Sequence, residues 1–300
     1  MTFVPPPGPH GGDGTTVAAA LGIHVTDLLD LSASLNPLAP DPTPVLRKHL
    51  DGVGRYPDAR EATAALADAI GVDIDNILLT NGGSEAISLL AAEIGGRVEE
   101  PEFSLHPRGA TGPRWRSNPH NPTGVLAAAD DTADVWDEAF YPLAAGAWTR
   151  ADPDVPVVGS LTKVFACPGL RVGYLLADAL LVDRCRVRQP TWSVNGLACA
   201  VLPDLLASAQ LSAWSRGIAE LRAALVGVLA EHGLHAAASD ANWLLVDAPG
   251  LRERLAPYGI LVRDCTSFGL PGTVRIAVPG PAGLHRLAGA LNTIHLRNTT

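Results

Sequence analysis

The sequence predicts an α/β protein: a mainly parallel sheet flanked by helices, followed by a smaller α+β domain. Three observations lead to this fold class. Helical and strand-like segments alternate from residue 59 to residue 160, as they do when helices connect the strands of a parallel sheet. From residue 211 onward the pattern changes to one long amphipathic helix, three strand-like segments and a last helix. The chain has 300 residues, 47% of them hydrophobic, which is enough for one large domain or two.

Each element of the first unit has a local signal. Apolar residues at helical spacing predict a helix over residues 59–71, which ends at a glycine, the usual residue after a helix C-terminus. A short apolar strand over 76–80 is followed by Asn-Gly-Gly-Ser and a second helix over 84–96. Two further strands are predicted to end at Asp137 and Ser160.

The second unit begins with an amphipathic helix from Leu211 to His232. Three apolar strands follow, and a final helix covers residues 282–297. The Pro- and Gly-rich start of the chain predicts an extended arm before the first unit. The predicted division is therefore an N-terminal arm, a large domain and a small domain: residues 1–45, 46–208 and 209–300.

Composition excludes several classes of function. A net charge of −9 argues against a general surface for nucleic acid or anionic membrane. No apolar run approaches the ~20 residues of a membrane span, and the N-terminus lacks the basic and apolar regions of a signal peptide. The four cysteines show neither metal nor disulfide spacing. We therefore expect a cytoplasmic protein with reduced thiols and no metal site.

The turn after the strand at 76–80 has the chemistry of a phosphate site. Gly82 and Gly83 let a ligand approach the backbone, and the helix that follows offers free N–H groups and the positive end of its dipole. The alternative is an ordinary turn in which Ser84 caps the helix.

Four other polar residues stand where a ligand site is expected. Lys163 follows the strand that ends at Ser160, and Asp137 ends another strand; the carboxyl ends of such strands are where α/β sheets bind ligands. Asn121 lies in a rigid Asn-Pro turn and is free to present its amide. Arg275 lies in an apolar strand, so it needs an anionic partner, either a protein carboxylate or a ligand carboxylate.

These segments occur in the order GGSEA, NPHNPTG, DEAF, SLTK, GLRVGY and VRIAV. The chain thereby resembles the fold-type I pyridoxal-phosphate enzymes of the aspartate-aminotransferase superfamily, class I/II, over most of its length. The resemblance implies a mainly parallel, seven-stranded-type sheet and pyridoxal 5'-phosphate as cofactor.

The resemblance also implies a role for each residue. Lys163 forms the Schiff base with the cofactor, and Asp137 keeps the pyridine nitrogen protonated. Asn121 bonds the ring 3'-oxygen, and Arg275 binds the substrate α-carboxylate. Tyr56 matches a tyrosine that reaches the neighbouring subunit's cofactor, which implies a homodimer with shared active sites. The cofactor phosphate is held by four residues: Gly83, Ser84, Ser160 and Arg171.

The N-terminal segment points to one branch of this superfamily. Its His-Gly-Gly and its Asp-hydrophobic-Ser run, ending in Asn-Pro-Leu, look like the cobalamin-pathway decarboxylases of L-threonine O-3-phosphate. Phe140 agrees, since the sister histidinol-phosphate aminotransferases more often have Tyr there. In both branches an arginine like Arg263 contacts the substrate phosphate, with His10 and Asn36 assigned to the same pocket. The alternatives are a surface ion pair for Arg263 and a mobile-arm position for His10.

The decarboxylase is the preferred activity and the histidinol-phosphate aminotransferase is the runner-up. Two departures from the family pattern bear on this. The segment PEFSLH places His106, or Phe103 in a shifted register, where an aromatic ring stacks on the cofactor. The connections between residues 103 and 135 are also shorter than usual. A third possibility is therefore a pyridoxal-phosphate-binding protein with degraded catalysis, against which the retained Lys163 and Asp137 weigh.

Overall fold

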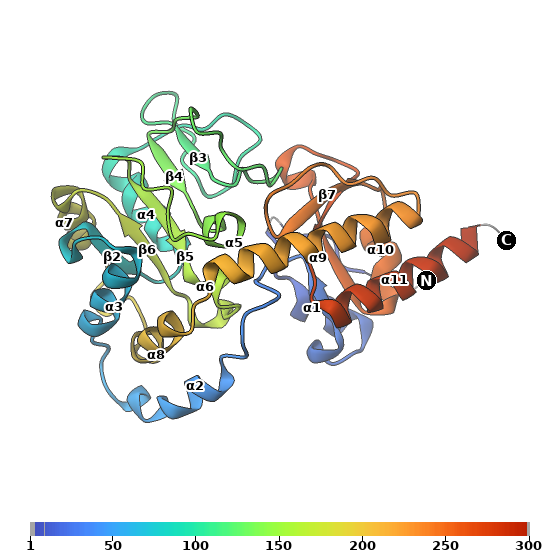
Figure 1. Ribbon diagram of the computed structural model, residues 1–300, viewed down its shortest axis with the longest axis horizontal. Helices are drawn as coiled ribbons and strands as arrows, with labels where there is room; N and C mark the ends of the chain where they lie inside the picture. Colours follow the sequence, from blue (N-terminus) through green and yellow to red (C-terminus); the bar gives the residue numbers. More distant parts are fainter. Residues whose placement is uncertain (1–3, 9, 299–300) are drawn as a thin grey trace.

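The computed structural model describes residues 4–8 and 10–298, and it contains two sheets (Figure 1). Within these residues the larger sheet has five strands in the order β2-β6-β5-β4-β3. Only β6 runs against its neighbours, β2 and β5, while β3, β4 and β5 are mutually parallel. The strands are Ile77–Thr80 (β2), Trp115–Ser117 (β3), Val135–Asp137 (β4), Val157–Ser160 (β5) and Gly173–Leu176 (β6).

Helices cover both faces of this sheet, which confirms the predicted α/β class. Leu79 and Val157 pack in a core with α3 and α8, whereas Leu78 and Val158 pack on the other side with α4 and α7. Strands buried on both faces explain why their sequences are apolar throughout rather than alternating. The helices of this unit are Thr43–Lys48 (α2), Arg60–Ile70 (α3), Gly83–Ile94 (α4), Tyr141–Ala145 (α5), Leu161–Val164 (α6), Ala179–Arg188 (α7) and Gly196–Ala207 (α8).

The smaller sheet has the order β1-β8-β9-β7 and packs against long helices. Its strands are Leu29–Leu31 (β1), Trp243–Asp247 (β7), Ile260–Asp264 (β8) and Thr273–Ala277 (β9). Its helices are Leu211–Glu231 (α9), Leu251–Leu255 (α10) and Pro281–Asn298 (α11). The predicted helices and strands of the second unit are thus confirmed.

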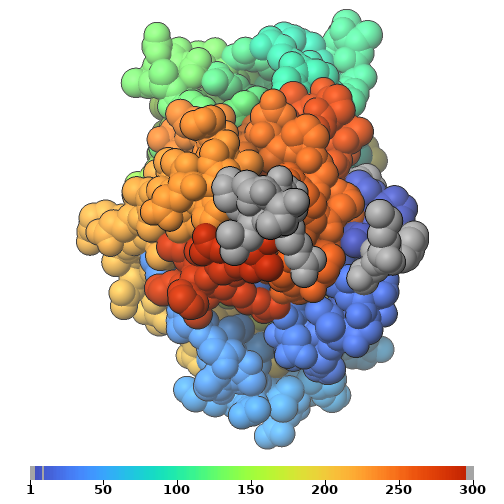
Figure 2. Space-filling model, turned by 90° about the vertical axis from the view of Figure 1, so that its right-hand side faces the viewer, coloured from blue at the N-terminus to red at the C-terminus, as the bar shows by residue number. Residues whose placement is uncertain are grey.

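The N-terminal segment is built into this smaller unit. It contains a helix, α1 (Gly14–Leu21), and the strand β1, which pairs in parallel with β8. Figure 2 shows the blue N-terminal residues beside the orange and red C-terminal ones. The buried Arg252 of α10 adds an ion pair to Asp13 (3.2 Å) and a bond to the Pro5 carbonyl (2.9 Å). Residues from the two ends of the chain therefore form one packed body, and the division into an arm and two domains remains a proposal.

The larger sheet has five strands among the described residues, rather than the seven of the expected type, and the connection between β3 and β4 is short. No helix lies between β3 and β4. Instead, the guanidinium of Arg150 binds the backbone of this connection. Arg150 lies over one buried indole, Trp136 (5.2 Å), and its N–H groups bond to carbonyls of residues 128, 129 and 131. Arg116 also lies over Trp136 (5.6 Å). Backbone carbonyls that a helix would satisfy internally are satisfied here by an arginine.

Two predictions from composition can be compared with the structure. All four cysteines are buried as free thiols, as predicted. Among the described residues, no single helix has the length and apolar character to cross a membrane; α8 and α9 meet those criteria only when taken together, and they are bent by 82°.

Candidate active site

A cavity of ≈220 Å³ lies at the carboxyl ends of β4 and β5 and extends to the smaller sheet. Polar residues from both units line it. These include most of those singled out in the sequence: His10, Gly83, Ser84, Asn121, Asp137, Ser160, Lys163, Arg171, Arg263 and Arg275. Three predicted site residues do not line it: Asn36, Tyr56 and His106.

Lys163 lies on α6, directly after β5, in a strongly cationic and buried position. Burial, and then the charges of Arg275, Arg171 and Arg263, lower the pKa of Lys163 to about 8. A lysine amine with such a lowered pKa is partly neutral near physiological pH, and the neutral form is a nucleophile. Asn36 supports this turn from outside the cavity, because its amide donates to the Val164 carbonyl (2.9 Å) and its backbone N–H donates to the Lys163 carbonyl (3.1 Å).

We expect covalent attachment of added pyridoxal phosphate to the apoprotein to become faster as the pH rises, with a midpoint near 8. The reason is that only the neutral amine of Lys163 attacks a carbonyl, and its lowered pKa sets the fraction in that form. Arg263→Gln removes a positive charge and should move the midpoint to higher pH. Arg216→Gln, on the exposed side of α9, should not. Stopped-flow absorbance measures this, and identical midpoints in all three proteins would contradict it.

The turn from β2 into α4 forms an anion site with Arg171. Gly82 has φ +78°, which strains any other residue, and a Cβ there would lie 2.5 Å from the Arg171 guanidinium and would have to displace it. Arg171 donates to the Ser84 hydroxyl (3.2 Å), and the Ser160 and Thr162 hydroxyls lie 2.8 Å apart. A helix N-terminus, a guanidinium and hydroxyls together suit a phosphate. Thr162 was missed in the sequence, although it lies within the SLTK segment.

Asn121 and Arg275 are joined across the two units. The Arg275 guanidinium donates to the Asn121 Oδ1 (2.9 Å). Since a guanidinium only donates, the amide oxygen must face Arg275, which leaves the amide nitrogen to donate to a ligand. The side chain of Asn121 is thus oriented by the strand that carries Arg275.

Two buried guanidiniums face the cavity from the smaller sheet. Arg263 on β8 and Arg275 on β9 are register partners, and both are buried, which excludes the surface position considered for Arg263. Among the described residues Arg275 has no carboxylate partner, and its Nε is buried without a hydrogen bond. Burial, and then the charge of Arg263, lower the pKa of Arg275. A buried charge of this kind requires an anion, and the cavity is where a ligand anion reaches it.

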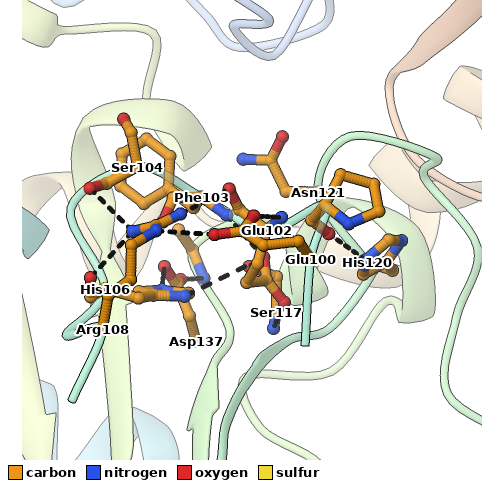
Figure 3. A network of polar contacts seen from close by, with 12 residues as sticks. Glu100, Glu102, Phe103, Ser104, His106, Arg108, Ser117, His120, Asn121 and Asp137 are labelled. Carbon is orange, nitrogen blue, oxygen red and sulfur yellow. Dashed lines mark hydrogen bonds and ion pairs between the residues drawn. The ribbon is translucent and has the colours of Figure 1, made fainter. Parts of the chain in front are cut away.

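Asp137 ends β4 and lines the cavity with its carboxylate held from two sides. Its Oδ1 accepts from the Ala139 N–H (2.9 Å), and its Oδ2 lies 2.9 Å from the His106 Nε2 (Figure 3). The His106 ring is fully buried behind this carboxylate, whereas Phe103 lines the cavity. Tyr56 is 78% exposed and stacks on Trp192, with ring centroids 4.3 Å apart.

Comparison with known proteins places this chain in a family. The family model for aminotransferase class I and II matches residues 115–291. The chain belongs to this family. A threonine-phosphate decarboxylase of Salmonella typhimurium is 31% identical, over 95% of this chain and 96% of that protein. A histidinol-phosphate aminotransferase of Halorubrum lacusprofundi is 30% identical, over 92% of this chain and 91% of that protein.

Solved structures agree on the fold. A histidinol-phosphate aminotransferase from Sinorhizobium meliloti, in complex with pyridoxal 5'-phosphate, has a TM-score of 0.82 at 18% identity and covers 99% of this chain and 96% of its own. An L-threonine-O-3-phosphate decarboxylase from Porphyromonas gingivalis has a TM-score of 0.72 at 22% identity, covering 88% and 98%. The predicted fold type I is confirmed.

Membership in the class I and II aminotransferases makes this chain a pyridoxal-phosphate-dependent enzyme. The cavity fits that cofactor. It offers an amine of lowered pKa, an anion site that brings the Arg171 guanidinium close to Gly82, and the carboxylate of Asp137. Lys163, Arg171 and Asp137 are the residues that would hold it.

Proposed function

We propose that this enzyme decarboxylates L-threonine O-3-phosphate, a step of cobalamin biosynthesis. The observation that carries the proposal is the pair of buried guanidiniums, Arg263 and Arg275, that line one cavity with Lys163. Threonine phosphate bears an amine, a carboxylate and a phosphate, so it offers one anion to each arginine. The free, buried cysteines agree with the proposed cytoplasmic location.

The two arginines differ in their surroundings, which supports a different anion for each. Arg275 is fixed by Asn121 and lies over Trp243 (4.9 Å), so it suits the planar carboxylate next to the reacting carbon. Arg263 lies over Phe268 (4.5 Å), on the side where His10 lines the cavity. Partial burial, and then the charge of Arg263, lower the pKa of His10. An anion shared by Arg263 and His10 is therefore the phosphate.

Pyridoxal phosphate, when bound, supplies the electron sink that stabilises negative charge on the substrate Cα. The residues around it select the bond that breaks. Arg275 holds the carboxylate while the Cα–carboxylate bond breaks and carbon dioxide leaves with the electron pair remaining on the substrate. The Lys163 amine, protonated, returns a proton to Cα. Asp137 holds a proton at the cofactor ring nitrogen.

Phe140 supports the decarboxylase branch. Its ring lies beside the amine of Lys163, 5.7 Å from Nζ to the ring centroid, and packs edge-to-face on Trp243. It therefore places no phenol hydroxyl beside the lysine, where the sister aminotransferases more often have Tyr.

The second candidate is transamination of the histidinol-phosphate type, and the relatives support it. Several relatives at 27–30% identity are named histidinol-phosphate aminotransferase, and one at 31% is named threonine-phosphate decarboxylase. The two reactions differ in which bond to Cα stands perpendicular to the cofactor ring. In transamination Lys163 would move the Cα proton. Histidinol phosphate has a phosphate but no carboxylate, so it offers Arg275 no carboxylate to bind.

The proposed enzyme works as a homodimer with shared active sites. Tyr56 and Trp192 form a stacked pair that is more than half exposed, and Leu50 and Val53 in the same segment are exposed too. Covering this apolar face with a second copy would bring Tyr56 to the partner's cofactor phosphate. Sedimentation equilibrium of wild type and Tyr56→Ser checks the dimer, and a monomer at micromolar concentration in the wild type would contradict it.

Mass spectrometry of products tests the reaction. Purified protein receives pyridoxal phosphate and O-phospho-L-threonine, with and without 2-oxoglutarate. Aminopropanol phosphate in both tubes is the expected result. Glutamate formed only with 2-oxoglutarate, with no loss of carbon dioxide, makes the protein an aminotransferase. Cofactor binding without turnover of threonine phosphate or histidinol phosphate makes it a binding protein with degraded catalysis.

A pair of variants tests the assignment of the two arginines. Arg275→Gln should weaken binding of threonine phosphate about 10- to 100-fold, as expected for loss of a charge-assisted pair, but leave binding of the product unchanged. The reason is that aminopropanol phosphate has lost the carboxylate and kept the phosphate. Arg263→Gln should weaken binding of both ligands. Steady-state kinetics of the holoenzyme measures this, through the KM for threonine phosphate and the inhibition constant of the product, and equal losses for both ligands in Arg275→Gln would reject the assignment.

A further inference from the structure

The loop between α7 and α8, residues 189–195, does not line the cavity, yet it bonds to both segments that form the anion site. One of these segments is the turn from β2 into α4, and the other is the turn that ends at Arg171. At the start of the loop, the amide of Gln189 donates to the Leu79 carbonyl of β2 (2.9 Å). The loop is thus attached to the strand that leads into the anion site.

Glu85, in the first turn of α4, is the main contact between this loop and the anion site. Its Oε2 accepts from the Asn81 backbone N–H (2.7 Å) and from the Gln189 amide (3.0 Å). Its Oε1 accepts from the Ser193 hydroxyl. Asn81 and Glu85 flank residues 82–84, so the first bond closes the anion-binding turn on itself. The other two bonds attach that turn to the loop.

The far end of the loop holds the second segment. The Asn195 Nδ2 donates to the Leu170 carbonyl (2.7 Å), and its Oδ1 accepts from the Ala198 N–H of α8 (2.9 Å). Arg171 has φ +56°, a left-handed conformation that is unfavourable for an arginine and persists only when its surroundings hold it. Because the Leu170 carbonyl belongs to the peptide that leads into Arg171, Asn195 supplies such support.

The two segments therefore meet in two places. At the cavity, Arg171 donates to the Ser84 hydroxyl (3.2 Å). Away from the cavity, the loop joins them through Glu85 and Asn195. Together these contacts fix the distance between the helix N-terminus and the guanidinium that would share one anion.

The charge of Glu85 and its hydrogen bonds have opposite effects on an anion at this site. A carboxylate next to Ser84 repels a bound anion, so its charge alone lowers the affinity. Its hydrogen bonds hold the turn in the shape that binds the anion, which raises the affinity. The sign of the change when Glu85 is removed therefore shows which effect dominates.

We propose that Glu85 is a positioning residue for the cofactor phosphate. By holding the turn at 82–84 to the loop at 189–195, it keeps the N–H groups of α4 and the Arg171 guanidinium directed at the same phosphate. The inference rests on the placement of the cofactor phosphate at this turn, and not on the proposed reaction or its substrate.

The test compares pyridoxal phosphate with pyridoxal, which has the same ring and aldehyde but no phosphate. Apoprotein is titrated with each compound, and the absorbance of the bound compound gives the affinity. Glu85→Ala should weaken binding of pyridoxal phosphate about 10- to 100-fold and leave binding of pyridoxal unchanged. Glu85→Gln should have a smaller effect, because its amide oxygen can still accept from the Asn81 N–H.

Three further variants separate the possible outcomes. Glu93→Ala is the matched control, since Glu93 also joins α4 to α7, through Arg184 (3.3 Å) and Arg188, but lies at the other end of the helix. It should leave both affinities unchanged. Ser193→Ala removes one bond to Glu85 and should weaken binding of pyridoxal phosphate by less than Glu85→Ala. Arg171→Gln tests the anion site: if it does not reduce the preference for pyridoxal phosphate over pyridoxal, the phosphate lies elsewhere.

A preference that falls in Arg171→Gln but not in Glu85→Ala overturns the inference alone. Tighter binding of pyridoxal phosphate to Glu85→Ala also overturns it, because the carboxylate would then act through its charge. Equal losses for both compounds would reflect general loosening and reject it as well. Thermal melting shows which variants are folded. If Glu85→Ala does not fold, Glu85→Gln and Ser193→Ala decide, and wild-type affinity for pyridoxal phosphate in both would reject the inference.

Discussion

Replacing Lys163 with alanine is expected to abolish turnover and the covalent attachment of the cofactor. No other lysine reaches this cavity, since the chain's second lysine, Lys48, lies on α2 and does not line it. The surrounding charges make Lys163 a nucleophile, and an amine from solution has neither its lowered pKa nor its position. Loss of a nucleophile that is also the proton carrier costs on the order of 10⁴-fold or more.

Two measurements check this. Mass spectrometry after borohydride reduction should find the cofactor on the Lys163 peptide in wild type and on no peptide in Lys163→Ala. Lys48→Ala is the matched control and should behave like wild type in both attachment and turnover. Wild-type turnover in Lys163→Ala would remove the lysine from the mechanism altogether.

Much of the candidate site could be predicted because its signals are local. A polar residue directly after a buried strand lies at the carboxyl edge of the sheet whatever the rest of the chain does, and this places Asp137, Ser160 and Lys163. The Gly82-Gly83 turn likewise depends only on one strand and the helix that follows. Gly83, Asp137, Ser160 and Lys163 each line the cavity as expected.

Contacts between distant parts of the chain could not be predicted in this way. The strand β1 pairs with β8, more than 200 residues later, and no pattern in the Pro-rich N-terminal segment indicates such a partner. Asn36 was assigned to the substrate pocket, yet its amide bonds the Val164 carbonyl behind the lysine. Both placements depend on how the two units pack together.

The position of His106 shows a second limit. Spacing within PEFSLH identifies the residue but not the direction of its ring, because the turn is shaped by Arg108 and by the strand end at Ser117. The shortened connections of the larger sheet show the same limit of prediction from sequence. That these connections are short can be predicted from the sequence. The packing of Arg150 on Trp136, which takes the place of a helix, is a tertiary contact and cannot.

Replacing Asp137 with alanine is expected to leave the cofactor bound but to slow turnover by about 10²- to 10³-fold or more, the range seen when a preorganised electrostatic partner is removed. The lysine and the phosphate site remain to hold the cofactor, whereas the ring nitrogen loses the carboxylate that keeps its proton. Without that proton the ring withdraws electrons weakly, so the step that leaves charge on Cα becomes slow. Steady-state kinetics at saturating cofactor measures this, with Asp134→Ala as control because Asp134 is exposed and only accepts from the Arg114 N–H. A normal rate in Asp137→Ala would mean that the reaction does not need a protonated ring.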